Sequence, residues 1–212
     1  MDRMRWVLVA GLLGAFLALA IGAHRVAAFS TDVRITRWVQ DHDPTLLDWL
    51  TTVTNRAMDG TPLSIVGIAI AAVLIARRHP LDAAVVAIAL AIRIINSGLK
   101  EIVESPRPTP DLVRVTDHAS GYGYPSGHAS GAMLVVGAVA WVAACHVQSC
   151  AWRTVIWIAA IALIALTGIG RVLVGVHWPT DVLGGWLWAG AALITITSAA
   201  GKWPTSDRPA GD

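Results

Sequence analysis

The chain is 212 residues long, and 55% of its residues are hydrophobic while only 14% are charged, whereas soluble domains carry about 25% charged residues. This composition excludes an ordinary soluble globular domain and a disordered chain. The formal net charge of +2 also gives no strongly basic surface of the kind that nucleic-acid binding requires. Because one membrane-spanning helix takes about 20 apolar residues, the apolar content suffices for about six spans in a single membrane domain, residues 1–212.

The first predicted span, 6–23, follows two arginines. It is longer than the apolar core of a secretory signal and lacks a good cleavage site, so we expect it to be retained. Residues 24–48 carry both charge signs and two tryptophans, which is typical of an interfacial loop or a short amphipathic segment. The strongly apolar part of the second span, 62–76, is short, and we expect this span to begin upstream within 50–60.

The third predicted span, 81–103, contains Arg93 and Lys100. Arg93 is the one charge expected inside the membrane, and we expect it to pair with a polar neighbour or a helix carbonyl group. A loop rich in proline, glycine and charge follows over 104–127. Three more spans and a polar tail complete the chain: 128–144, 154–168, 181–200 and 201–212.

The two cysteines, Cys145 and Cys150, lie in the polar break between the fourth and fifth spans, with His146 beside them. A structural zinc site takes four ligands. Because these three residues are too few, we predict reduced thiols there and neither a metal site nor a redox pair.

Six spans place both termini on the same side of the membrane. The basic residues of the connecting segments divide equally between the two sides. We favour cytoplasmic termini because two arginines precede the first span and a further pair, Arg77 and Arg78, lies in a very short connection. Three polar clusters, 100–108, 124–128 and 171–181, then lie together at the extracytoplasmic face of a multi-pass membrane protein.

These clusters supply three cations, Lys100, Arg107 and Arg171. Taken singly, a cation of this kind can simply reach the lipid headgroups. However, Ser126 is expected to cap the fourth span, and Gly127 lets an anion approach the free N–H groups of the first helical turn. Several positive groups around one point indicate a bound polyanion, for which phosphate is the natural candidate.

The clusters also contain two histidines with different surroundings. Pro179 suits the first position of the last span, so that His177 lies just before this helix and Asp181 lies in its first turn. The acid can then orient His177 as a nucleophile, by the logic of a catalytic triad. His128, for which the pattern offers no acid partner, can protonate the departing oxygen.

The three clusters resemble the motifs of the type 2 phosphatidic acid phosphatases, whose fold and active site are shared with the vanadium haloperoxidases. The motifs Lys-x6-Arg-Pro, Pro-Ser-Gly-His and Ser-Arg-x5-His-x3-Asp correspond to Lys100 with Arg107 and Pro108, to 125–128, and to Arg171 with His177 and Asp181. Order and internal spacing agree, and the resemblance covers about 81–200. Gly170 stands where the family usually has serine, so one hydroxyl contact to the phosphate is missing, although a backbone N–H group can serve there.

The resemblance implies an all-α bundle of six transmembrane helices and a metal-independent lipid phosphatase that needs no cofactor and forms a phosphohistidine. His177 would attack phosphorus, Asp181 would hold it, and His128 would protonate the leaving group. The implied phosphate-binding residues are Lys100, Arg107, Ser126, Gly127 and Arg171. Family members of this size act on phosphatidic acid, phosphatidylglycerol phosphate or polyprenyl diphosphates. These substrates and the oligomeric state stay open, because apolar helix faces discriminate poorly between lipid chains.

Three other functions fit part of the pattern. An anion or lipid transporter would line its path with Arg93, Lys100 and the histidines, but the polar residues gather at one membrane face. Vanadate-dependent peroxidases are generally soluble and larger. An inactive, lipid-binding relative is disfavoured by the complete set of candidate catalytic residues. The expected partners are therefore a membrane lipid phosphate and the bilayer, and not a nucleic acid.

Overall fold

The computed structural model describes residues 3–42 and 45–201, and this part of the chain contains nine α-helices and no β-strand. The helices are α1 (Arg3–Arg25), α2 (Ser30–Asp41), α3 (Thr45–Ala57), α4 (Gly60–Ala76), α5 (Pro80–Arg93), α6 (Ile95–Val103), α7 (Gly127–His146), α8 (Cys150–Leu173) and α9 (Pro179–Ala199). The expectation of an all-α membrane bundle is confirmed. Of the predicted polar tail 201–212, only Gly201 lies within the described residues.

The number of membrane crossings agrees with the sequence prediction. Five stretches of helix in the described chain are long and apolar enough to cross a membrane: α1, α5 together with α6, α7, α8 and α9. A sixth crossing results when α3 and α4, which are bent by 62° with respect to each other, count as one broken span. The bend explains why the apolar part of the second predicted span is short. This apolar part lies in α4, whereas the upstream half of the span is α3, which runs in another direction.

Two spans differ in detail from the prediction. The third is divided at Ile94 into α5 and α6. The fifth is expected to end near Gly168, but α8 continues to Leu173, and its last residues, including Arg171, are buried. Because protein rather than lipid surrounds this last turn, a charged residue does not end the helix there.

Arg93, in the last turn of α5, is the charged residue expected inside the membrane. Its Nη2 atom donates to the carbonyl oxygen of Gly60 at 3.0 Å and to the Ser64 hydroxyl at 2.8 Å. The expected pairing with a helix carbonyl group and a polar neighbour is therefore confirmed. These bonds join α5 to α4. Arg93 therefore has a structural role, and its position does not require that it line an ion pathway.

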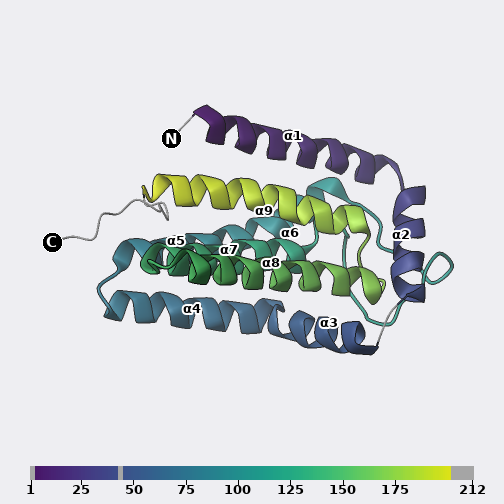
Figure 1. Cartoon of the computed structure of the whole chain (residues 1–212). Helices are drawn as coiled ribbons and strands as arrows, with labels where there is room; N and C mark the ends of the chain where they lie inside the picture. The colour runs from purple at the N-terminus through teal and green to yellow at the C-terminus, as the bar shows by residue number, and fades with distance from the viewer. Residues whose placement is uncertain (1–2, 43–44, 202–212) are drawn as a thin grey trace.

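α7 is the central helix, and α4, α5, α8 and α9 pack around it (Figure 1). Its apolar side chains, such as Leu134 and Trp141, are buried. The first turns of α7 and α9 approach closely, and the backbone N–H of Ser126 donates to the carbonyl oxygen of Asp181 at 2.9 Å. Gly185 permits this approach, since an added Cβ atom would lie 2.8 Å from the Ser126 carbonyl oxygen. The bundle thus brings two helix N-termini together.

α2 runs across one end of the bundle (Figure 1) and turns its polar side toward the protein. Asp32, Thr36 and Gln40, spaced by four residues, are buried, whereas Ile35 and Trp38 are exposed. The predicted segment 24–48 therefore contains an amphipathic helix whose apolar side chains face outward. Its position at the membrane interface remains a prediction.

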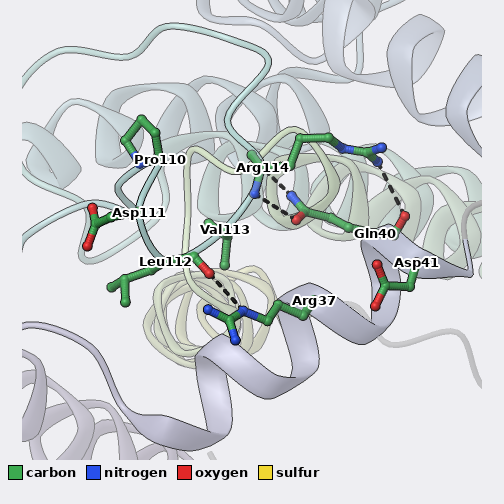
Figure 2. Close-up of a pocket in the computed structure, with 8 residues that line it drawn as sticks. All are labelled: Arg37, Gln40, Asp41, Pro110, Asp111, Leu112, Val113 and Arg114. Atoms are coloured by element: carbon green, nitrogen blue, oxygen red, sulfur yellow. Dashed lines mark hydrogen bonds between the residues drawn. The ribbon is translucent and has the colours of Figure 1, made fainter.

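The polar side of α2 anchors the long loop that connects α6 to α7 (Figure 2). The Gln40 side-chain amide donates to the Arg114 carbonyl oxygen at 2.7 Å and accepts from the Arg114 backbone N–H at 3.0 Å. The same amide donates to the Leu173 carbonyl oxygen at 2.9 Å, and the Arg37 Nε atom donates to the Leu112 carbonyl oxygen at 2.8 Å. These bonds fix the loop against the C-terminal end of α8.

Candidate active site

The predicted site residues lie at one end of the bundle, where α6 and α8 end and α7 and α9 begin. Lys100 and Arg171 occupy the last turns of α6 and α8, and His128 and Asp181 occupy the first turns of α7 and α9. Arg107 comes from the connecting loop. Both N-terminal helix ends carry partial positive charge, which favours an anion there.

His177 and Asp181 form a buried pair. The Nδ1 atom of His177 lies 3.3 Å from Asp181 Oδ2, and both residues are almost completely covered. The same carboxylate oxygen accepts the backbone N–H of Trp178 at 2.9 Å, and Pro179 begins the helix as expected. The expected contact between the acid and His177 is confirmed, and one helical turn supplies it.

Arg107 lies against the other nitrogen of this imidazole, with its Nη1 atom 3.2 Å from His177 Nε2. A guanidinium group only donates, so Nε2 accepts with its lone pair and the ring proton resides on Nδ1, facing Asp181. Burial lowers the pKa of His177 well below its ordinary value, and the nearby positive charge of Arg107 lowers it further. The ring is therefore neutral near pH 7 and offers a nucleophilic nitrogen.

α2 contributes a residue that the sequence pattern does not reveal. The Asp32 carboxylate accepts from the Thr180 backbone N–H at 3.2 Å and from the Thr180 hydroxyl at 2.6 Å. Asp32 thereby satisfies an N–H group in the first turn of α9, next to Asp181. This contact fixes the helix end that positions the His177–Asp181 pair.

The three cations all contact one short part of the loop, residues 117–122. The bonds are Lys100 Nζ to the Tyr122 carbonyl oxygen at 3.1 Å, Arg107 to the Ser120 and Gly121 carbonyl oxygens at 3.1 and 2.9 Å, and Arg171 Nη1 to Asp117 Oδ2 at 3.3 Å. The Asp117 carboxylate thus supplies a negative charge beside Arg171.

His128 has an acid partner, contrary to the sequence expectation. Its Nε2 atom lies 3.3 Å from Asp59 Oδ1, and Asp59 belongs to the bend between α3 and α4, far away in the chain. The two histidine–acid pairs differ in exposure, because the Asp181 side chain is fully buried while that of Asp59 is 60% exposed. Ser126 caps α7, as expected, by accepting the backbone N–H of Ala129 at 3.5 Å.

A cavity of about 580 Å³ opens beside His128 and Arg171 and is also lined by Asn55, Asp59 and Asp117. It reaches two motif residues, His128 and Arg171. His177 is not part of its wall and has only 2% of its surface exposed. The cavity therefore reaches His128 and Arg171 but not His177.

Gly170, the departure from the family motif, faces Asn55 of α3. A Cβ atom added at Gly170 would collide with the Asn55 side-chain amide, so the amide fills the space that a serine would take. Asn55 is buried and lines the cavity, and its Oδ1 atom has no hydrogen-bond partner. The sequence offers no signal for this residue, because α3 lies far from the three motifs.

Comparison with known proteins agrees with this geometry. Residues 80–204, more than half of the chain, match the family model of the PAP2 superfamily. The chain belongs to this superfamily. The resemblance stated from the three motifs is thereby confirmed, and the PAP2 match includes every motif residue discussed above.

Two curated relatives and one solved structure are similar to this PAP2 chain. Phosphatidylglycerophosphatase B of Bacillus subtilis (strain 168) is 32% identical over 173 residues, which cover 80% of this chain and 83% of the relative. Undecaprenyl-diphosphatase of Sulfolobus acidocaldarius is 44% identical over 66 residues, or 31% of this chain and 28% of the relative. The crystal structure of a transmembrane PAP2-type phosphatidylglycerolphosphate phosphatase from Bacillus subtilis superposes with a TM-score of 0.80 at 26% identity and covers 90% of this chain and 94% of its own. These matches and the apolar helices establish a multi-pass membrane protein of a lipid phosphatase family.

Proposed function

We propose that the chain hydrolyses the phosphomonoester or diphosphate of a membrane lipid through a phosphohistidine at His177. One observation carries this proposal: the Nε2 lone pair of a buried, neutral histidine lies beside the Arg107 guanidinium, while Asp181 holds the opposite nitrogen. A phosphoryl group bound by that arginine would lie next to the attacking atom. Proximity of this kind is a large part of what a phosphotransfer site supplies.

The chemistry has two displacement steps. First, His177 Nε2 forms a bond to phosphorus while the bond from phosphorus to the lipid oxygen breaks, and His128 gives its proton to that oxygen. Asp59, 3.3 Å from the Nε2 atom of His128, would orient this ring. Second, water attacks phosphorus and returns a proton to His128, the nitrogen–phosphorus bond breaks, and inorganic phosphate leaves. Asp181 stabilises the positive charge on His177 between the two steps.

The phosphoryl oxygens would be held by Lys100, Arg107 and Arg171 together with the N-terminus of α7, where Ser126 and Gly127 lie. These groups supply positive charge and N–H donors at the place where negative charge concentrates in the transition state. No step requires a metal ion. The segment 117–122 competes with the substrate for the same cations.

Among the possible substrates we favour phosphatidylglycerol phosphate. The relative named phosphatidylglycerophosphatase B matches 80% of this chain, whereas the undecaprenyl-diphosphatase matches 31%. The test is phosphate release by the purified chain in detergent from phosphatidylglycerol phosphate, phosphatidic acid and undecaprenyl diphosphate, with a chelator present. We expect turnover of at least the first, unaffected by the chelator. A folded protein that releases phosphate from none of the three lipids, or only when metal is added, would refute the proposal.

We place the active site at the extracytoplasmic face. Arg77, Arg78 and the start of α1 lie at the opposite end of the bundle, and short basic connections favour the cytoplasm. The basic residues at the site end contribute less to this rule because several bind protein groups, such as Arg37 on the Leu112 carbonyl oxygen and Arg171 on Asp117.

The pH dependence of turnover should reflect the lowered pKa of His177. The ring is nucleophilic above its pKa, so kcat/KM should fall only as the pH drops below 6.5, the ordinary histidine value. Arg107→Gln removes a positive charge beside the ring and should move the acid limb to higher pH, besides weakening phosphate binding. The measurement is the pH profile of kcat/KM for both proteins. The assignment of His177 as the nucleophile would be contradicted if the acid limb lay at or above pH 6.5 and Arg107→Gln did not move it.

The pair of Asn55 and Gly170 allows a test by exchange. We propose that the Asn55 amide makes the phosphate contact for which the family uses serine. Asn55→Ala should lower kcat/KM by about 10- to 100-fold, as loss of a hydrogen bond to a charged group does. Gly170→Ser alone should also lower it, because the new side chain collides with Asn55.

In the double variant Asn55→Ala/Gly170→Ser, the Asn55 amide no longer occupies the space, and Thr51, whose Cβ atom would lie 2.8 Å from the new Cβ atom, has to shift before the serine hydroxyl can replace the amide. We expect kcat/KM of this variant to exceed that of a matched control with the same Cβ atom. The matched control is Asn55→Ala/Gly170→Ala, which adds that Cβ atom without a hydroxyl group. Equal activity of the two double variants would show that Asn55 only fills space.

A further inference from the structure

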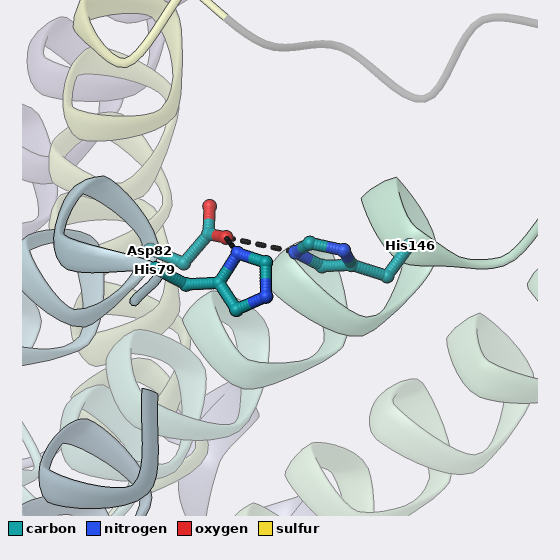
Figure 3. Close-up of side chains that lie close together, drawn as sticks. All are labelled: His79, Asp82 and His146. Carbon is teal, nitrogen blue, oxygen red and sulfur yellow. Dashed lines mark hydrogen bonds and ion pairs between the residues drawn. The ribbon is translucent and has the colours of Figure 1, made fainter. Parts of the chain in front are cut away.

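A second cluster of polar side chains lies at the end of the bundle opposite the active site (Figure 3). His79 directly precedes α5, Asp82 lies in the first turn of α5, and His146 is the last residue of α7. One ligand atom of each residue lies within 4.8 Å of the other two. The 20 residues of α7 span about 30 Å, so this cluster is independent of the catalytic groups and of the function proposed for them.

The Asp82 carboxylate is the centre of the cluster. Its side chain is only 1% exposed, while each imidazole is 44% exposed. Oδ2 of Asp82 lies 2.8 Å from His146 Nε2 and 3.8 Å from His79 Nδ1. The shorter distance is a hydrogen bond, but the longer one exceeds that range. The His79 ring also packs edge-to-face against the His146 ring, with ring centroids 4.8 Å apart, so both imidazoles are held beside the same carboxylate oxygen.

We propose that His79, Asp82 and His146 bind a divalent transition-metal ion, with Zn²⁺ as the best match. Two imidazole nitrogens and one carboxylate oxygen form a donor set typical of zinc, whereas Mg²⁺ and Ca²⁺ prefer oxygen ligands alone. Ligands at about 2.0–2.2 Å in a tetrahedron are roughly 3.3 Å apart. The 2.8 and 3.8 Å separations bracket that value, so small rotations of the exposed rings suffice.

The exposed sides of the two rings leave the fourth coordination position to water and give the ion a path of entry. The ion would neutralise a buried carboxylate and tie the start of α5 to the end of α7, two helices that pack together in the core. An ion that binds only the folded chain raises its stability. The inferred role is thus structural, and it differs from the sequence-based expectation that the chain holds no metal.

The test uses the full chain purified in detergent, stripped of metal with a chelator and then titrated with Zn²⁺ alone. We expect one bound zinc per chain by elemental analysis, a rise of the melting temperature with added Zn²⁺, and a tetrahedral Co²⁺ absorption spectrum on substitution. His79→Gln and His146→Gln should each lower the Zn²⁺ affinity by more than the roughly 100-fold that loss of a supporting contact costs. His42→Gln, which changes an exposed histidine directly after α2, is the matched control and should bind as the unaltered chain does.

Both substituted histidines are partly exposed, so the variants are expected to fold, and retained phosphate release from a lipid verifies this. His128→Gln tests whether the zinc binds at the active-site end of the bundle instead. If it does, His128→Gln loses the zinc and the His79 and His146 variants keep it. A chain that takes up no zinc, or a His79→Gln/His146→Gln double variant that keeps its zinc, would overturn the proposal. Neither outcome depends on whether the lipid phosphatase mechanism is correct.

Discussion

Replacement of His177 by alanine is expected to abolish phosphate release from the lipid substrate. Loss of the attacking group in a covalent mechanism costs on the order of 10⁶-fold in kcat in a serine protease, and no other group of this site takes its place. The cations that hold the phosphate are unchanged, so substrate binding should remain measurable. The measurement is single-turnover phosphate release together with equilibrium binding of the lipid phosphate.

His42→Ala is the matched control, since it removes an exposed imidazole directly after α2. It should keep nearly full activity. Turnover of His177→Ala well above background would mean that another group attacks phosphorus, and the assignment of the nucleophile would then have to be abandoned.

Asp181→Asn is expected to lower kcat by roughly 10⁴-fold, as the corresponding change does in a serine protease. The carboxylate accepts from both Trp178 N–H and His177 Nδ1. Both donors contact the same oxygen, Oδ2. An asparagine that keeps its oxygen there lacks the negative charge that stabilises the positive charge on His177 during the reaction. An asparagine that places its NH₂ group there presents N–H groups to the imidazole, so the ring carries its proton on Nε2 and loses the nucleophilic lone pair.

KM should change little in this variant, because Asp181 lies behind the histidine and contacts no phosphoryl oxygen in the proposed mechanism. Steady-state kinetics on the lipid substrate separates the two parameters. A reduction of kcat below tenfold would show that the acid does not control the tautomer of His177.

The parts of the site that the sequence predicts are local. His177 and Asp181 are four residues apart, on either side of the helix start that Pro179 fixes, so a contact between the acid in the first turn and the residue before the cap is expected. Ser126 before an apolar helix likewise predicts a cap. The family resemblance then assigns roles to these residues, which remain proposals for this chain.

The residues that the sequence does not reveal come from distant segments. Asp59 and Asn55 reach the site only because α3 and α4 bend beside α7 and α8. The partners of Lys100 and Arg107 are largely backbone carbonyl groups, which carry no residue-type signal. Hydropathy also places the end of α8 too early, because it assumes that lipid surrounds the helix and therefore takes the charged Arg171 as a sign that the span has ended. In the structure Arg171 is buried and bonded to Asp117, and α8 continues past it.

The most direct test of the account is to trap the phosphoryl group on His177. In His128→Ala, nitrophenyl phosphate can still phosphorylate the enzyme, because nitrophenolate leaves without a proton, while the second step lacks its base. Turnover of this substrate by the unaltered chain is the necessary control. Alkaline quench and peptide mapping should then show a burst of nitrophenolate approaching one per chain and phosphate on His177. Steady turnover by this variant with no burst and no phosphorylated histidine, or phosphate on a different residue, would contradict the account.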